Sequence, residues 1–130
     1  MNLTIPVSLL IVHFIGDFLL QSDWMALNKS KKWEVLMVHA FVYGMCFAPW
    51  GSQFAVITYS AHFFTDAITS RITSKLWFME PRLIENEVGE QFNVWIPKDP
   101  NPRHWFFVMI GLDQLIHCLT LAVTYYYLFG

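Results

Sequence analysis

The sequence predicts an all-α protein, a four-helix transmembrane bundle that forms a single integral membrane domain over residues 1–130. The first observation is composition, since 55% of the 130 residues are hydrophobic and only 14% are charged. The second is that four apolar stretches have about the length that crosses a bilayer. The third is that all eight Lys and Arg residues fall in segments that would lie on one side of it. Low charge and many aromatic residues also exclude a disordered chain and a nucleic-acid partner.

The four predicted helices cover residues 3–24, 33–48, 53–77 and 104–129. An α-helix rises about 1.5 Å per residue, so roughly 20 residues cross about 30 Å of hydrocarbon. The first, third and fourth helices reach that length when their flanks are included, and the second is the shortest. A turn around Pro49 connects the second helix to the third.

The basic residues orient the predicted bundle. Lys29, Lys31 and Lys32 lie between the first two helices, and the other five basic residues lie at or between the ends of the third and fourth. Short loops rich in Lys and Arg stay in the cytoplasm, so both termini are expected outside it (N-out/C-out). This pattern predicts a multi-pass protein of the bacterial inner (cytoplasmic) membrane, with membrane lipids as its partners.

A cytoplasmic acidic loop over residues 79–103 connects the third and fourth predicted helices. Three prolines interrupt any helix in its second half. Phe92–Ile96 is typical of a short strand, which would pair with Leu83–Glu87 around Gly89 as a β-hairpin. The alternative, equally favoured by the sequence, is a solvated loop that lies on the lipid headgroups.

Seven ionisable residues lie inside the predicted helices, where such residues are costly and usually face a bundle interior. In the first and third helices a His precedes an Asp by four residues, which places both side chains on one helix face. The fourth helix repeats this spacing in reverse order, and the second contains a lone His. The seven residues are His13, Asp17, His39, His62, Asp66, Asp113 and His117.

The reversed order predicts a layered arrangement. Because the fourth helix runs opposite to the first and third, every Asp would lie on the cytoplasmic side of its His, about 6 Å away along the axis. His39 would approach the Asp layer from the second helix. The His layer would consist of His13, His62 and His117, and the Asp layer of Asp17, Asp66 and Asp113.

Imidazoles and carboxylates in a water-poor interior are ligands for zinc, manganese or iron, and facing helices build dimetal sites from such pairs. We therefore predict a divalent transition-metal site with one or two ions, for which all seven residues are candidate ligands. Gln21 and Gln114 would support the ligands through hydrogen bonds. Two alternatives stay open: a proton or cation relay, and interhelical hydrogen bonds that serve structure alone.

At these residues the chain resembles a family of small bacterial and phage-encoded integral membrane proteins of unknown function. The family pattern is H-x-x-x-D-x-x-x-Q followed by a Trp and a Lys, then a lone His, then H-x-x-x-D, then D-Q-x-x-H. This sequence carries it at His13, Asp17, Gln21, Trp24, Lys29, His39, His62, Asp66, Asp113, Gln114 and His117. The chain is also distantly similar to membrane-bound metal-dependent hydrolases. That similarity is one of pattern and leaves the reaction open.

The favoured function is a metal-dependent hydrolase that acts on a lipid or lipid-linked substrate near the inner leaflet, because a bound metal activates water near neutral pH. Asp17 is the candidate catalytic base, with Gln21 orienting it. One alternative is a transporter or proton relay, whose path would require a homo-oligomer of this short chain. The other is a phage-encoded protein that occupies a host membrane complex, with the polar cluster serving only to hold its fold.

Overall fold

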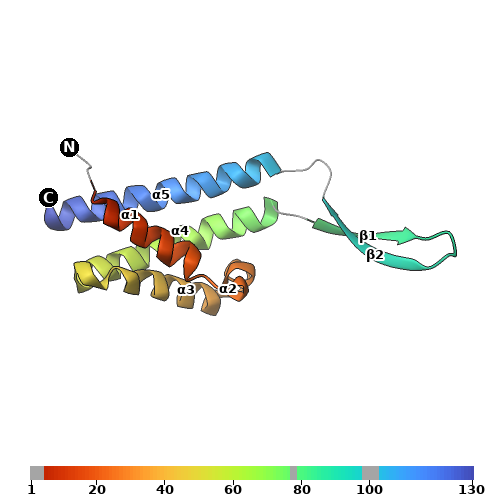
Figure 1. Cartoon of the computed structure of the whole chain (residues 1–130), viewed down its shortest axis with the longest axis horizontal. Helices are drawn as coiled ribbons and strands as arrows, with labels where there is room; N and C mark the ends of the chain where they lie inside the picture. Colours follow the sequence, from red (N-terminus) through yellow and green to blue (C-terminus); the bar gives the residue numbers. More distant parts are fainter. Residues whose placement is uncertain (1–4, 77–78, 98–102) are drawn as a thin grey trace.

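The computed structural model describes residues 5–76, 79–97 and 103–130, which form a mostly helical protein with one small antiparallel sheet (Figure 1). The elements are α1 (Val7–Phe14), the π-helix η1 (Ile15–Leu19), α2 (Asp23–Asn28), α3 (Trp33–Cys46), the 3-10 helix η2 (Ala48–Trp50), α4 (Ser52–Leu76), β1 (Met79–Glu85), β2 (Gln91–Pro97) and α5 (Arg103–Phe129). The helical class is as predicted, but the described residues form five α-helices in place of four.

The helices form a bundle from which the hairpin of β1 and β2 projects (Figure 1). α4 packs against α3 and against α5, while α1 and η1 contact α3. α1 begins and α5 ends at the end of the bundle opposite the hairpin. The segment around α2 lies at the hairpin end of α3, so the basic residues before α3 and those near the end of α4, Arg71 and Lys75, share one end of the bundle (Figure 1).

The single predicted helix over residues 3–24 is replaced by three shorter pieces. α1 continues as the π-helix η1, and a new helix, α2, begins at Asp23. Gly16 lowers the helix propensity inside the stretch. Ser22 caps the new helix, because its Oγ accepts a hydrogen bond from the N–H of Met25 at 3.2 Å. The apolar run hid these two local signals, which is why the interruption was not predicted.

α3 and α4 are joined by a tight turn and approach each other closely. Gly51, which follows η2, has a φ of 107°, in the region that favours glycine. Gly44 of α3 faces Tyr59 of α4, and a Cβ atom at Gly44 would lie 2.7 Å from the Cβ of Tyr59. The missing side chain therefore allows the two backbones to come close near the middle of the bundle.

Most hydroxyl side chains of α4 form hydrogen bonds with backbone carbonyl groups of the same helix. The side chains of Thr58, Thr65 and Thr73 each donate a hydrogen bond to the carbonyl four residues earlier, at 2.7–2.9 Å. Such bonds let a helix carry many Ser and Thr residues in apolar surroundings.

Among the described residues, one helical segment, His104–Phe129 of α5, is long and apolar enough to cross a membrane, with a mean hydropathy of 1.8. Val7–Leu19 and Trp33–Cys46 are apolar but shorter. This criterion, which rests on length and composition alone, supports one of the four predicted spans. The break after η1 explains the short first segment.

The acidic loop contains a β-hairpin, so the first of its two predicted alternatives is correct. β1 and β2 pair antiparallel along their whole length. In the turn, Asn86 Oδ1 accepts hydrogen bonds from the N–H groups of Val88 and Glu90 at 3.1 and 2.9 Å, and Gly89 has a φ of 84°. Asn86 and Glu87 belong to this turn rather than to the first strand.

An apolar core fills the half of the bundle nearest the chain ends. Leu9, Phe47, Phe54 and Leu121 are at most 1% exposed. Tyr43 belongs to the same core, and its hydroxyl lies 2.9 Å from the Nδ1 atom of an imidazole further along the bundle. Polar side chains begin at that point.

Candidate metal centre

A cluster of buried imidazoles and carboxylates lies in the middle of the bundle. His39, His62, Asp66 and His117 are each 1% exposed, and Asp17 is 4% exposed. They come from η1, α3, α4 and α5. Burial of so many ionisable groups requires that they pair with one another or hold an ion.

Helix spacing positions the side chains of α4, and ring contacts fix the orientation of one of them. His62 and Asp66 lie one turn apart and face the same interior. The His62 ring lies nearly parallel to that of Tyr43, with centroids 3.8 Å apart, and its centroid is 4.3 Å from that of His117. Within the described part of the chain, His62 Nδ1 is buried without a hydrogen-bond partner. Stacking therefore holds this ring, and its Nε2 atom points to the carboxylates.

The π-helix η1 brings Asp17 to the cluster. A π-helix widens one helical turn and is frequent at functional sites. Gly16 lies against α3, where a Cβ atom would be 3.1 Å from Cδ2 of Tyr43. This close approach places Asp17 Oδ1 3.2 Å from His39 Nε2 and 3.5 Å from His62 Nε2.

Four ligand atoms converge in the cluster, and we call them the first donor set: Asp17 Oδ1, His39 Nε2, His62 Nε2 and Asp66 Oδ2. The two nitrogens are 3.0 Å apart, and Asp66 Oδ2 lies 3.4 Å from that of His39 and 3.6 Å from that of His62. Zinc bonds of about 2.0–2.2 Å require ligand separations of roughly 3.3–3.6 Å in a tetrahedron. The first donor set could therefore hold one tetrahedral ion.

A second donor set consists of Asp17, Asp113 and His117, whose ligand atoms all lie within 4.8 Å of one another. His117 Nε2 is 3.4 Å from Asp113 Oδ1 and 3.1 Å from Asp66 Oδ1. One oxygen of Asp66 thus belongs to the first donor set and the other faces His117 of the second, while Asp17 belongs to both sets. Shared carboxylates are how bundle proteins hold two neighbouring ions, so the cluster could hold one ion or two.

Gln114 connects the carboxylates to His13. Its Nε2 donates hydrogen bonds to Asp17 Oδ2 at 2.9 Å and to Asp113 Oδ2 at 3.1 Å, and its Oε1 lies 2.8 Å from His13 Nε2. Because the amide oxygen can only accept, His13 Nε2 carries the proton, and His13 Nδ1 accepts from the Tyr43 hydroxyl. Both nitrogens of His13 are therefore used, and this predicted ligand lies outside both donor sets.

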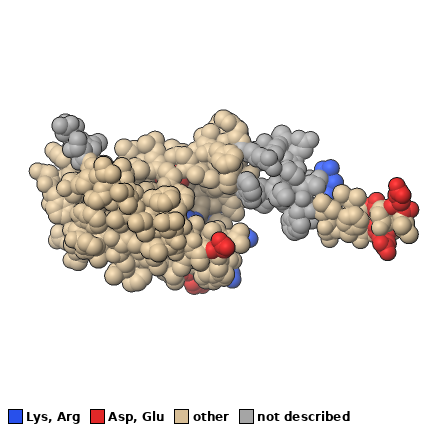
Figure 2. Space-filling model, in the orientation of Figure 1, with Lys and Arg blue, Asp and Glu red and all other residues tan. Residues whose placement is uncertain are grey.

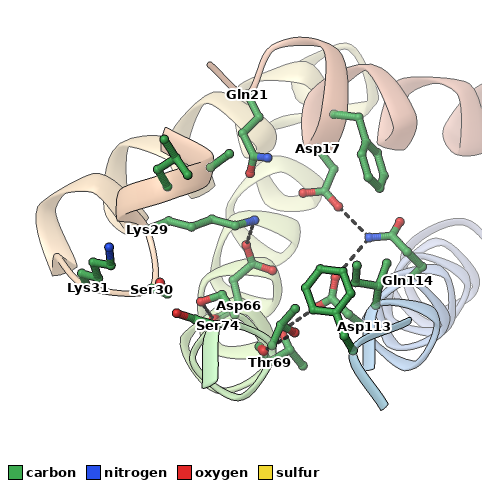
Figure 3. A pocket seen from close by; sticks show the side chains of 17 residues that line it. Asp17, Gln21, Lys29, Ser30, Lys31, Asp66, Thr69, Ser74, Asp113 and Gln114 are labelled. Carbon is green, nitrogen blue, oxygen red and sulfur yellow. Dashed lines mark hydrogen bonds and ion pairs between the residues drawn. The ribbon is translucent and has the colours of Figure 1, made fainter. Parts of the chain in front are cut away.

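Gln21, which was predicted to orient Asp17, has a different environment. Its side chain points into a cavity beside the donor sets (Figure 3). In the part of the chain that the structure describes, its Oε1 atom is buried without a hydrogen-bond partner. Gln21 therefore makes no described hydrogen bond through this oxygen, whereas Gln114 donates hydrogen bonds to Asp17 and Asp113.

Lys29 is the functional residue that sequence reasoning missed. Its Nζ lies 2.8 Å from Asp66 Oδ2 and 3.4 Å from His39 Nε2. Burial of the ammonium group lowers its pKa, but the carboxylates of Asp66 and Asp17 raise it more, so the pKa lies above its ordinary value of 10.5. A continuous helix would have carried Lys29 away from the cluster, whereas the break between η1 and α2 allows its side chain to reach Asp66. The Trp and Lys of the family pattern were the signal that could have identified it.

A cavity of about 480 Å³ opens beside the two donor sets. Its wall contains carboxylates from η1, α4 and α5, the ammonium groups of Lys29 and Lys31, and hydroxyl groups of α4 (Figure 3). Figure 2 shows a few acidic and basic atoms in a recess of the bundle face, and the other charged atoms of the bundle in this view lie toward its hairpin end. A small molecule can therefore reach the cluster from the side of the bundle.

Over residues 5–130 the chain matches the family described as "Protein of unknown function (DUF3307)". No curated protein and no solved structure showed a significant similarity to it. The match agrees with the resemblance to a family of unknown function, and it assigns no substrate.

Proposed function

We propose that this chain, which belongs to the DUF3307 family of proteins of unknown function, is a membrane-embedded metal-dependent hydrolase that acts on a lipid or lipid-linked substrate. The observation that carries the proposal is the first donor set. Five distances between its four ligand atoms lie between 3.0 and 3.6 Å, close to the separations of roughly 3.3–3.6 Å in a tetrahedral zinc site.

The distribution of side chains supports a membrane environment. The interior of the bundle contains His, Asp and Thr, whereas large apolar side chains cover the outside. Phe41, Phe64, Ile68, Phe107 and Leu115 are each more than half exposed. A soluble protein rarely exposes an apolar surface of this extent around a polar interior. Lipid is the solvent that stabilises this arrangement.

The charges support a multi-pass orientation. Lys29, Lys31 and Lys32 lie at the same end of the bundle as Arg71 and Lys75, which are near the end of α4. By the positive-inside rule this end faces the cytoplasm and the opposite end faces outward. The cluster then lies toward the inner leaflet of a cytoplasmic membrane, with short α1–η1 and α3 accommodated by local thinning of the bilayer.

The ligand chemistry supports zinc, manganese or iron. Mixed imidazole and carboxylate donors suit each of these metals. When bound, such an ion lowers the pKa of a water molecule and polarises a carbonyl or phosphoryl oxygen. One ion would use the first donor set, and in that arrangement the Asp113 carboxylate would remain unliganded.

The geometry favours Asp113 over Asp17 as the general base. Asp17 Oδ1 faces two imidazoles of the first donor set, and the Asp17 side chain is only 4% exposed. Asp113 lines the cavity, and its side chain is 16% exposed. Gln114 and the Thr69 hydroxyl each donate a hydrogen bond to it and hold it in place. Asp113 can therefore accept a proton from a molecule in the cavity.

A proton relay across the whole bundle is less favoured by the described core. The polar chain ends at His13 and the Tyr43 hydroxyl. Beyond them lie Leu9, Phe47 and Leu121, which are buried and apolar. A relay needs polar groups or water on both sides of the cluster.

Hydrolysis in a reconstituted system tests the proposal. Purified protein in lipid vesicles should release product from phospholipid or lipid-linked phosphate substrates, lose this activity after chelation and regain it with added Zn²⁺ or Mn²⁺. Asp113→Asn should lower the rate by roughly 100-fold or more, as loss of a general base does, while metal content is retained. The exposed variant Gln53→Leu is the matched control. Metal-loaded protein that hydrolyses no ester or phosphoester of a lipid would contradict the proposal.

A further inference from the structure

Lys29 brings a positive charge into the first donor set. Its Nζ contacts Asp66 Oδ2 (Figure 3) and lies 3.4 Å from His39 Nε2. Both of these atoms belong to the first donor set. The ammonium group is thus placed beside ligand atoms that a metal ion would take.

The cavity beside these ligands changes the sign of its charge when an ion binds. Its wall contains three carboxylates, Asp17, Asp66 and Asp113, and two lysines, Lys29 and Lys31. Negative charges therefore exceed positive charges by one. A divalent ion in the first donor set reverses this balance. An anion is attracted into the cavity only after the metal has bound.

We propose that Lys29 is a cationic latch on the metal site and, once a metal ion displaces it, the group that binds a phosphate on the substrate. This inference rests on the proposed function. Before metal binding, the ammonium group neutralises Asp66. When the ion takes that carboxylate, the flexible side chain stays within reach of the cavity and pairs with an anion there. Lys29 thereby couples substrate binding to metal occupancy.

The rest of the cavity wall fits a phosphate group on an amphiphilic molecule. Lys31 supplies a second ammonium group and Ser30 a hydroxyl, and such groups form charge-assisted hydrogen bonds to phosphate. Phe18, Leu27 and Ile110 supply an apolar side to the same cavity. Its volume of about 480 Å³ is that of a small-molecule site. The ligand class is a phosphate monoester or diester, on a lipid or free in solution.

Metal titration tests the latch. In detergent-solubilised protein stripped of metal, Lys29→Gln should bind Zn²⁺ roughly tenfold more tightly than the wild type, since no charge-assisted bond to Asp66 must be broken. Glutamine can still donate a hydrogen bond to Asp66, which keeps the variant folded, and a thermal melt checks this. Lys32→Gln is the matched control, because Lys32 is exposed and does not line the cavity. An unchanged Zn²⁺ affinity in Lys29→Gln would overturn the latch.

Phosphate binding tests the second role of Lys29. Radiolabelled inorganic phosphate should bind the zinc-loaded wild type in equilibrium dialysis but not the metal-stripped protein. Lys29→Gln should weaken this binding by roughly tenfold or more, and Lys32→Gln should not. Mixed micelles containing phosphatidic acid should compete if the source is a lipid, whereas competition by inorganic phosphate alone would assign a soluble source. Equal phosphate affinity in wild type and Lys29→Gln would overturn this role.

The two proposals fail in different ways. If the wild type binds no Zn²⁺ in the titration, the proposed metal-dependent function itself is wrong. If the wild type binds Zn²⁺ but Lys29→Gln leaves both affinities unchanged, the metal site stands and only the role of Lys29 is rejected.

Discussion

The Nε2 atoms of His39 and His62 face each other at 3.0 Å in the buried interior of the bundle. Two neutral imidazoles can be this close when one Nε2 carries a hydrogen and donates a hydrogen bond to the other. A cation between them would instead be bound by the lone pairs of both nitrogens. Asp17 Oδ1 and Asp66 Oδ2 flank the same point at 3.2–3.6 Å. The pair could therefore provide two ligands directed at one position, and the predictions below follow from this possibility.

The first prediction concerns the two imidazoles. His39→Ala and His62→Ala should each lower metal occupancy and reduce the free energy of unfolding by about 1–3 kcal/mol, because the remaining ligands lose a partner in the buried cluster. The double variant should lose much less than the sum, since both residues serve one site. Metal analysis and thermal unfolding in detergent measure these effects.

His104→Ala is the control for this cycle, because His104 is exposed at the start of α5. It should change neither metal content nor the melting temperature. Strictly additive losses in the double variant would assign His39 and His62 to separate hydrogen bonds and reject the shared site.

The second prediction concerns the support of the carboxylates. Gln114→Leu removes two hydrogen bonds to Asp17 and Asp113 and leaves His13 Nε2 without its acceptor. Loss of such supporting bonds costs about 10–100-fold in metal affinity, which isothermal titration would measure. The exposed Gln53→Leu should bind metal like the wild type. Equal affinities for both variants would show that the Gln114 network does not position the ligands.

The third prediction concerns the close approach of α3 and α4. Gly44→Ala places a Cβ atom 2.7 Å from the Cβ of Tyr59, so the helices must move apart. The expected loss is about 1–3 kcal/mol of unfolding free energy, with weaker metal binding, since His39 and His62 sit on these helices. Gly111→Ala, whose Cβ would meet nothing within 4 Å, should be neutral or stabilising by up to about 1 kcal/mol. Similar melting temperatures for both variants would contradict this packing.

The fourth prediction concerns metal removal. An ion that binds only the folded chain stabilises it by about 2.7 kcal/mol at a free concentration of roughly 100 times Kd. Chelation should therefore lower the melting temperature, and added Zn²⁺ should restore it. The double variant of His39 and His62 should show little response to either treatment. A wild type that melts at one temperature with and without metal would argue against binding at this cluster.

The fifth prediction separates the metal site from the hairpin. β1 and β2 project away from the bundle (Figure 1), so replacing residues 83–92 with a short Gly/Ser linker should leave metal content unchanged. Loss of metal from this variant would mean that the hairpin completes the site. Loss of a biological function with metal retained would instead support a role for the hairpin in partner binding.

The site was more predictable from the sequence than the helices that carry it. Helix geometry alone places His62 beside Asp66 and Asp113 beside His117, because the members of each pair are four residues apart. Tertiary packing seldom alters that geometry. The break after η1 depends on Gly16 and on the Ser22 cap, whose weak local preferences compete with a strong apolar pattern. Such boundaries are the least reliable part of a sequence pattern.

Lys29 and His13 show how that break changed the site. After the break before α2, Lys29 contacts Asp66, a contact that no helical period predicts. His13 keeps the predicted face of its helix, but Tyr43 and Gln114 occupy both of its nitrogens. Whether an imidazole binds a metal or an amide depends on its neighbours in space. The position of the His in the sequence pattern does not reveal those neighbours.

The metal-to-protein ratio of the purified chain tests the central claim most directly. Protein purified in mild detergent without chelator should contain at least one zinc, manganese or iron ion per chain by mass spectrometry of the elements, and Asp17→Asn combined with Asp66→Asn should contain almost none. A wild type without a stoichiometric transition metal, or a double variant that retains it, would contradict the assignment of the cluster as a metal site.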